Sequence, residues 1–217
     1  MKSNQDYKNS ALAALRGHWA PAVVAAIVYI VCAILVSMIY SFADPETTPD
    51  FVYMAVTMVA TLLSVLAVYP IQVGYFNAHR MLLSGADDNI TANTFKIAFG
   101  SWLRNAGGYF LMALYVFFWS LLLLVPGIIK SLAYSMTPYI LVDNPELGVN
   151  EAIDMSQKMM KGHKFELFCL LLSFMGWIVL SMMTLCIGFF WLMPYMYTTL
   201  AAYYEDLKVE YESKATV

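Results

Sequence analysis

Long apolar stretches that alternate with short polar segments limit the possible fold of this sequence more than any other feature. The first two stretches, residues 20–42 and 51–77, exceed the roughly 20 apolar residues that a helix needs to cross a bilayer. Charged residues make up only 12% of the chain, whereas a soluble domain carries about 25%. The sequence therefore predicts an all-α, polytopic membrane protein.

We expect about six transmembrane helices, arranged as three hairpins. Their expected bounds are residues 20–42, 51–77, 107–125, 128–142, 167–185 and 189–204. We place the turn of the second hairpin at Pro126 and Gly127, because Pro and Gly together favour a turn. The fourth and sixth stretches would form only about 23 Å of helix at 1.5 Å per residue. Two interpretations therefore remain open for them, full crossing and a re-entrant hairpin.

The positions of Lys and Arg predict the orientation. Eleven of the twelve lie before the first stretch, between hairpins or after the last stretch, and only Lys130 lies near an opposite turn. Because short cytoplasmic loops carry an excess of Lys and Arg, both termini are expected in the cytoplasm. We interpret Lys130 either as an anchor that reaches the outer headgroups or as a charge that faces the bundle and holds an anionic ligand.

A threefold internal repeat is also visible. Each predicted hairpin follows a short amphipathic segment, namely KNSALAALRGHW, ITANTFKIAFGSWLRNAGG and GVNEAIDMSQKMMKGHK. We expect these segments to form helices in the membrane interface, with apolar residues such as Phe95, Phe99, Trp102, Ile153 and Met159 toward the lipid. The chain is thus predicted to be a single membrane domain, residues 1–217, with pseudo-repeats at about 6–83, 91–142 and 149–207.

Several words of the sequence resemble those of a known family. They are PGIIK, AYSMTPYI, NEAI and GHK, together with the opening KNSALAALRGHWAPAVVAAIVY. In these words the chain resembles a bacterial family of integral membrane proteins catalogued as domain of unknown function 975. The resemblance covers nearly the whole chain and implies a bacterial inner-membrane protein. It implies no reaction, substrate or catalytic residue.

Few residues suggest chemistry. Common catalytic and nucleotide-binding motifs are missing from the sequence, so we predict no catalytic residue, metal ligand or cofactor. His18 and His163 hold equivalent repeat positions; they could bind a metal with Glu151 or Asp154, but we interpret them as interface residues. Further candidate polar positions are Lys130, which was introduced above, and the group Ser131, Ser135 and Thr137. This group would hydrogen-bond across helices or line a narrow polar path.

Three functions remain open at this point. The first is a non-catalytic membrane protein that acts through lipid or protein interaction, or that protects the membrane. The second is a small-solute transporter or channel, which the internal repeats favour. The third, and the weakest, is a membrane enzyme that acts on lipid head groups. We expect membrane lipids as partners, with a protein partner or a homo-oligomer as further candidates. We expect no nucleic acid as a partner, because the formal net charge is −3 and basic residues form only small clusters.

Overall fold

The computed structural model describes residues 2–86 and 89–215, and every element in this part is helical. The elements are α1 (Asn4–Leu15), α2 (Trp19–Tyr40), α3 (Asp50–Leu63), the π-helical η1 (Ser64–Val68), α4 (Tyr69–Ser84), α5 (Ile90–Gly100), α6 (Trp102–Leu122), α7 (Leu124–Tyr134), α8 (Thr137–Asp143), α9 (Val149–Met159), α10 (Lys164–Leu172), α11 (Met175–Met183) and α12 (Phe189–Ala215). The predicted all-α class is confirmed.

Among the described residues, three helical segments are long and apolar enough to cross a membrane. They are Trp19–Tyr40, the continuous run Asp50–Ser84 and Lys164–Met183. The 22 residues of α2 would extend over about 33 Å at 1.5 Å per residue, enough for the hydrocarbon core of a bilayer. These segments contain the predicted second stretch and most of the first and the fifth.

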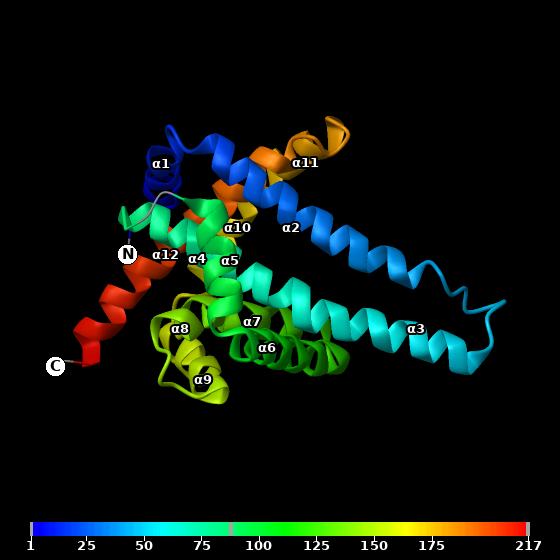
Figure 1. Cartoon of the computed structure of the whole chain (residues 1–217). Coiled ribbons are helices and arrows are strands. Elements are labelled where there is room, and N and C mark those ends of the chain that lie inside the picture. Colours follow the sequence, from blue (N-terminus) through cyan, green and yellow to red (C-terminus); the bar gives the residue numbers. More distant parts are fainter. Residues whose placement is uncertain (1, 87–88, 216–217) are drawn as a thin grey trace.

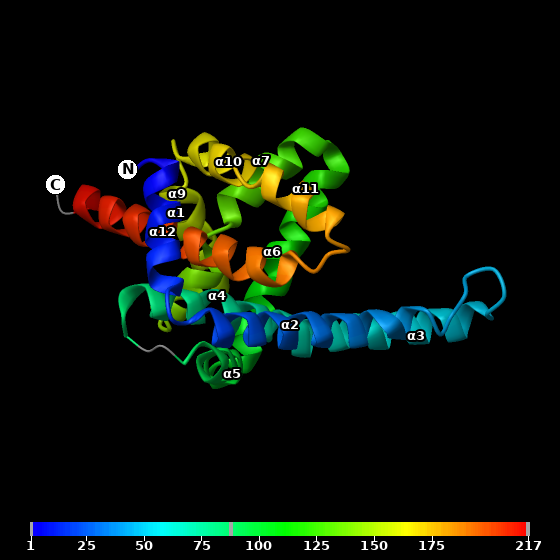
Figure 2. The same ribbon diagram turned by 90° about the horizontal axis from the view of Figure 1, so that it is seen from above.

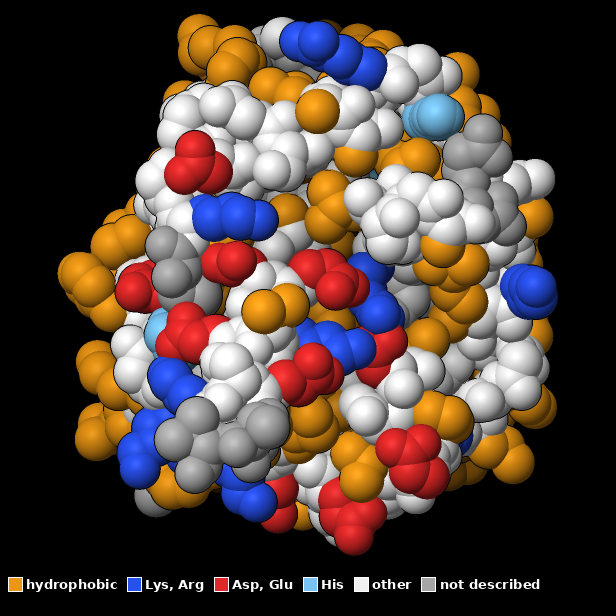
Figure 3. Space-filling model, turned by 90° about the vertical axis from the view of Figure 1, so that its left-hand side faces the viewer, with side chains coloured by type: hydrophobic (Ala, Val, Ile, Leu, Met, Phe, Trp, Pro, Cys, Tyr) orange, Lys and Arg blue, Asp and Glu red, His pale blue; other side chains and the backbone are white. Residues whose placement is uncertain are grey.

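The turns between paired helices lie at one end of the molecule, and the two chain termini lie at the other. Figures 1 and 2 both show the α2–α3, α6–α7 and α11–α12 turns on the side away from the two chain ends. In both views the α2–α3 pair projects well beyond the other turns. Charged side chains gather on the opposite end, around the termini, with hydrophobic side chains at its margins (Figure 3). We call this end the polar end.

A proline shapes the long helix that runs from α3 through η1 to α4. Pro70 has no backbone N–H, so it cannot donate to the carbonyl of Leu66 four residues earlier. The indole N–H of Trp102 donates to that carbonyl instead, and the helix widens into a π-turn directly before Pro70. The helix therefore continues past the proline, and the carbonyl that the proline leaves free joins η1 to Trp102, the first residue of α6.

The predicted turn at Pro126 and Gly127 is wrong. The helix is interrupted at Leu123, whose backbone is extended, and Pro126 and Gly127 lie in the first turn of α7. A proline fits there because the first N–H groups of a helix have no partner within it. Gly127 lets α7 approach α6 closely, since an added Cβ would lie 2.8 Å from the Cα of Ser120.

A second break was not predicted. Ser173 and Phe174 separate α10 from α11 within the predicted fifth stretch. The ammonium of Lys8 donates to the carbonyl of Ser173 at 3.0 Å and lies 4.3 Å from the centre of the Phe174 ring. A cation is favourable at a helix C-terminus, where carbonyls are left without helical partners. Lys8 of α1 therefore holds the end of α10.

The three amphipathic segments form helices α1, α5 and α9, but their apolar faces do not share one environment. Phe99 and Trp102 are exposed, as expected for a face toward lipid, whereas Ala98 is buried. The expectation is wrong for α9, because Ile153 and Met159 are only 2% exposed and belong to protein clusters with α7, α8 and α12. The short α8 gives α9 a protein surface to pack on.

Candidate functional site: a basic pocket at the polar end

Three distant parts of the chain meet in an ion-pair junction at the polar end. Arg80 of α4 pairs with Asp143 at the end of α8 and with Glu205 of α12. The carboxylate of Asp143 also accepts hydrogen bonds from the hydroxyl of Tyr204 and the ammonium of Lys208, each at 2.8 Å. All these side chains are at least partly buried, so each charge needs its partner.

Burial and pairing act in opposite directions on Asp143. Burial alone would raise the pKa of this carboxyl group. The hydrogen bond from Lys208 and the charge of Arg80 outweigh that effect and hold the pKa below its ordinary value of 3.8. Asp143 is therefore ionised at neutral pH and can bind both cations.

A second set of bonds fixes the end of α8 on its neighbours. The guanidinium of Arg104, from α6, donates to the carbonyls of Asn144 and Leu147 at 2.7 Å, and also to the carbonyl of Leu141. The buried amide of Asn77, from α4, donates to the carbonyl of Pro138 at 2.9 Å. Asn77 thus holds the start of α8, and Arg104 holds its end and the loop that leads to α9.

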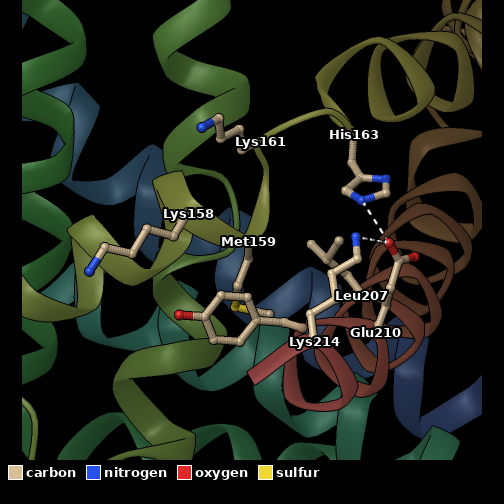
Figure 4. Close-up of a pocket in the computed structure, with 8 residues that line it drawn as sticks. Lys158, Met159, Lys161, His163, Leu207, Glu210 and Lys214 are labelled. Atoms are coloured by element: carbon tan, nitrogen blue, oxygen red, sulfur yellow. Dashed lines mark hydrogen bonds and ion pairs between the residues drawn. The ribbon is translucent and has the colours of Figure 1, made fainter. Parts of the chain in front are cut away.

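A basic pocket opens beside this junction, between the end of α9 and the second half of α12 (Figure 4). Its volume is about 390 Å³, and its charged or titratable lining residues are Lys158, Lys161, His163, Glu210 and Lys214. Met159, Leu207 and Tyr211 complete the wall. The lining thus holds three lysines, one histidine and one carboxylate.

Two of the lysines carry the surplus charge. Lys214 donates to Glu210 at 2.6 Å, and this hydrogen bond is the main reason that the pKa of Glu210 is lowered. Within the described part of the chain, Lys158 and Lys161 form no ion pair, and both are exposed. A phosphate or carboxylate group would supply the charge that these two side chains lack.

His163 joins the two walls of the pocket. Its Nδ1 lies 3.0 Å from Glu166 and its Nε2 lies 3.1 Å from Glu210, so both ring nitrogens face carboxylates. Its backbone carbonyl also accepts from the hydroxyl of Tyr203 at 3.0 Å. Gly162, with a φ of +93°, makes the tight turn that brings His163 to α12, a conformation that residues with a Cβ rarely adopt.

Lys130, the cation that breaks the charge pattern, faces protein. Its ammonium lies 4.7 Å from the centre of the Trp119 ring and donates to the side-chain oxygen of Gln157 at 3.1 Å. These contacts join α7 to α6 and α9. The structure thus matches the bundle-facing interpretation of Lys130 in its geometry, while its role stays a prediction.

The other predicted polar positions do not come together. Ser131 and Ser135 donate to the carbonyls of Ile128 and Leu132, within their own segment, and the role expected for this group stays a prediction. Thr137 is fully buried at the start of α8. His18 precedes α2, where its carbonyl accepts from the N–H of Ala22, and it does not line the basic pocket.

Sequence reasoning missed most of the residues at the polar end. Arg80, Asp143 and Glu205 lie about 60 residues apart in the sequence, so no local pattern predicts that they meet. The available signal was that each follows the apolar part of an expected even-numbered stretch. Among the described residues there is no group of three His, Cys, Asp or Glu that could hold a metal ion.

Comparison with known proteins gives one match. The family model described as "Protein of unknown function (DUF975)" matches residues 89–210, more than half of the chain. The chain belongs to this family. The matched region includes six of the eight residues that line the basic pocket, all but Tyr211 and Lys214. It also includes Asp143 and Glu205 of the junction, while Arg80 lies outside it. Comparisons with curated proteins and with solved structures gave no match.

Proposed function

We propose that this DUF975 protein is a multi-span inner-membrane protein that acts by binding, with its polar end in the cytoplasm. Three apolar helices of membrane-spanning length support the membrane location. The charge at the end that holds both termini, set against turns that contain few cations, supports the orientation. Under this proposal the three helix pairs each cross the membrane and return.

The ligand proposed for the basic pocket is the phosphate group of an anionic lipid. The observation that carries this proposal is the pair of lysines, Lys158 and Lys161, that line a 390 Å³ pocket without an ion-pair partner in the described chain. The pocket also lies directly before the apolar segment Lys164–Met183, so a bound phosphate would sit at headgroup level. Basic pockets on the cytoplasmic side of membrane helices bind anionic head groups.

The contacts of His163 favour binding over catalysis. A histidine acts as a general base through a ring nitrogen that is free to take a proton from the substrate. Glu166 and Glu210 lie within 3.1 Å of the two ring nitrogens of His163, so neither nitrogen faces the pocket without a partner. We therefore assign His163 a positioning role, in which it fixes the α9–α10 turn against α12.

Lipid retention by the full-length protein tests this proposal. We would purify the protein with a mixture of phosphatidylglycerol and phosphatidylcholine and count the bound lipids by native mass spectrometry. We expect the double variant Lys158→Gln/Lys161→Gln to lose preferential retention of phosphatidylglycerol by about tenfold, because it removes two charge-assisted contacts. Lys96→Gln, at an exposed lysine of α5, is the matched control and should retain the preference.

Two outcomes would reject the assignment. Unchanged preference in the double variant would show that another surface selects the anionic lipid. If inorganic phosphate at millimolar concentration stabilised the folded protein against unfolding as much as the lipid does, the ligand would be a soluble anion. The double variant should fold normally, since neither lysine forms an ion pair with a described residue.

A further inference from the structure

A second cavity lies at the other end of α12, away from the basic pocket. It is a groove of about 400 Å³ whose walls carry three tryptophans, Trp19 of α2, Trp177 of α11 and Trp191 of α12. We call it the tryptophan groove. Leu192, which is only 5% exposed, lines it as well, whereas Trp177 and Trp191 are half exposed. Figure 2 shows the first half of α12 between α2 and α11, which agrees with this lining.

The groove offers little to a polar ligand. Its serine and threonine already use their hydroxyl protons within the chain, since Ser181 donates to the carbonyl of Trp177 at 2.8 Å and Thr184 to that of Ser181 at 2.9 Å. The remaining lining is aliphatic or aromatic apart from Gly188 and the Tyr195 hydroxyl. Ligand pockets of about 300–1,000 Å³ with such a lining take apolar molecules.

The position of the groove between two candidate spans indicates which apolar molecule can reach it. Trp19 begins the candidate span Trp19–Tyr40, and Trp177 lies within the candidate span Lys164–Met183. A groove between two such segments opens to the hydrocarbon of the bilayer, where the surrounding solvent is acyl chain. Trp is also enriched at the membrane interface, where its ring is apolar and its N–H is polar.

A cation lies close in sequence to the α1 side of the groove. Leu12 of α1 lines the groove, and Arg16 follows it by four residues, the spacing that puts two side chains on one side of a helix. Arg16 is exposed and ends α1, and it forms no ion pair with any residue of the described chain. A lipid whose chain filled the groove would have its phosphate within reach of this region.

We propose that the tryptophan groove binds one acyl chain of an anionic phospholipid, with the headgroup at Arg16. This site is separate from the basic pocket; it rests on the membrane location proposed above but not on the ligand proposed for that pocket. At their closed end α11 and α12 meet at Gly188, where an added Cβ would lie 2.7 Å from the hydroxyl of Ser181. The bound chain ends at this contact and lies between two of the candidate spans.

Photocrosslinking of the full-length protein tests the site. The protein is placed in nanodiscs of phosphatidylethanolamine and phosphatidylglycerol that contain a phosphatidylglycerol with a diazirine in one acyl chain, and adducts are mapped by peptide mass spectrometry. We expect adducts to concentrate on Trp177, Leu180 and Trp191. Equal adduct density on the exposed residues Met54 and Met58 of α3 would overturn the proposal, because it would mean that the groove holds lipid no better than any apolar face.

Two variants separate groove binding from general lipid contact. Thr184→Trp fills the groove and should reduce adducts there by about tenfold, the change expected when the contacts of about two methylene groups are lost. Met183→Trp, at a neighbouring exposed residue that does not line the groove, should leave the adducts unchanged. A similar loss in both variants would overturn the assignment.

The headgroup is tested with Arg16→Gln. This variant should lower crosslinking by the phosphatidylglycerol probe and leave crosslinking by a matched phosphatidylethanolamine probe unchanged. Equal crosslinking by both probes in the unmodified protein would overturn the anionic part of the proposal. Protein–protein crosslinks through Leu180, obtained in place of lipid adducts, would mean that a second copy of the chain fills the groove.

Discussion

The carboxylate of Asp143 gathers Arg80, Tyr204 and Lys208 from two other parts of the chain. Its side chain is 11% exposed and that of Arg80 is 19% exposed, so both charges are largely removed from water. A buried charge that loses its partner is costly, whereas the intact pair adds little beyond its own desolvation. The junction therefore penalises arrangements in which the three parts are not together.

Asp143→Asn should destabilise the protein. We expect a loss of about 3 kcal/mol in the free energy of unfolding, at the low end of the range for breaking a buried pair, because Arg80 keeps Glu205. Unfolding by sodium dodecyl sulfate in mixed micelles measures it. Glu146→Gln, at an exposed carboxylate between α8 and α9, is the control and should change the value little. A change below about 1 kcal/mol would show that the junction is solvated.

The same carboxylate predicts a pH dependence. Because the pKa of Asp143 is lower in the folded chain than its ordinary value of 3.8, its stabilising effect is complete well above pH 3.8. That effect is lost as the pH falls through the depressed folded-state pKa. The stability difference between the unmodified protein and Asp143→Asn should therefore be constant around neutral pH and shrink in acid. A difference that grows on acidification would contradict the sign of the shift.

Lys130 gives a second prediction for a single residue. Its ammonium lies over the Trp119 ring and bonds to Gln157, and Arg can make both contacts whereas Gln keeps only the polar one. Lys130→Gln should thus lower the free energy of unfolding by about 1 kcal/mol, and Lys130→Arg should leave it unchanged within error. Equal loss in both variants would mean that the site needs the shape of lysine and not its charge.

At the scale of the elements, α4 and α5 pack against each other very closely, and their closest approach is at Gly74 of α4. A Cβ on Gly74 would collide with the carbonyl oxygen of Thr94 and lie 3.0 Å from the N–H nitrogen of Ala98. Because those atoms are backbone, the helices would have to separate. This close approach buries Ile90, Asn93 and Ala98, and it leaves Phe99 and Trp102 on the outside, where we expect the lipid surface.

Gly74→Ala should therefore weaken the attachment of α5. We expect a loss of about 1–3 kcal/mol, the usual cost of overpacking, together with faster proteolysis between α4 and α5. Gly107→Ala in α6 is a matched control, because nothing lies within 4 Å of the added Cβ. It should gain up to about 1 kcal/mol from the higher helix propensity of alanine. Equal behaviour of the two variants would contradict the close packing of α4 on α5.

Much of this element-level structure followed from the sequence, and the exceptions have physical causes. Apolar length predicted α2 and the long helix from α3 to α4, since no tertiary contact is needed to make such a segment helical in a membrane. The break at Leu123 and the carbonyl contact of Lys8 depend on tertiary neighbours, which no local pattern shows. For the same reason the amphipathic face of α9 predicted a buried surface correctly but could not distinguish protein from lipid as the partner. The basic pocket could not be predicted either, because it forms only where α9 and α12 lie side by side.

The whole molecule has a feature that bears on the internal repeat. Ser120 and Gly127 touch across the α6–α7 turn, Ser181 and Gly188 touch across the α11–α12 turn, and each serine donates to the carbonyl four residues before it. The same spacing and contact in both turns support the proposed pseudo-repeats 91–142 and 149–207. The α2–α3 turn lies much farther out in Figures 1 and 2, so the first pair departs from the other two.

Unequal reach of the three turns leads to a prediction about topology. If all three pairs cross the membrane, the shorter pairs need a bilayer that thins around them, or turns that lie at the depth of the outer headgroups. We would replace Cys32, Cys169 and Cys186 by Ala and introduce single cysteines at exposed positions: Thr47, Leu123, Leu185 and Ser213. Labelling of intact cells with a membrane-impermeant maleimide then reports the side and depth of each position.

We expect Thr47→Cys to be labelled rapidly from outside and Ser213→Cys only after the cells are broken. Leu123→Cys and Leu185→Cys should be labelled from outside but more slowly, because a turn at headgroup depth exposes the thiol less often to the aqueous reagent. Labelling of these two only after breakage would mean that the second and third pairs enter and leave from the cytoplasmic side. The first pair would then be the one that crosses, and the non-helical turns at Leu123 and Leu185 would have to be shielded by protein, since lipid cannot satisfy their backbone groups.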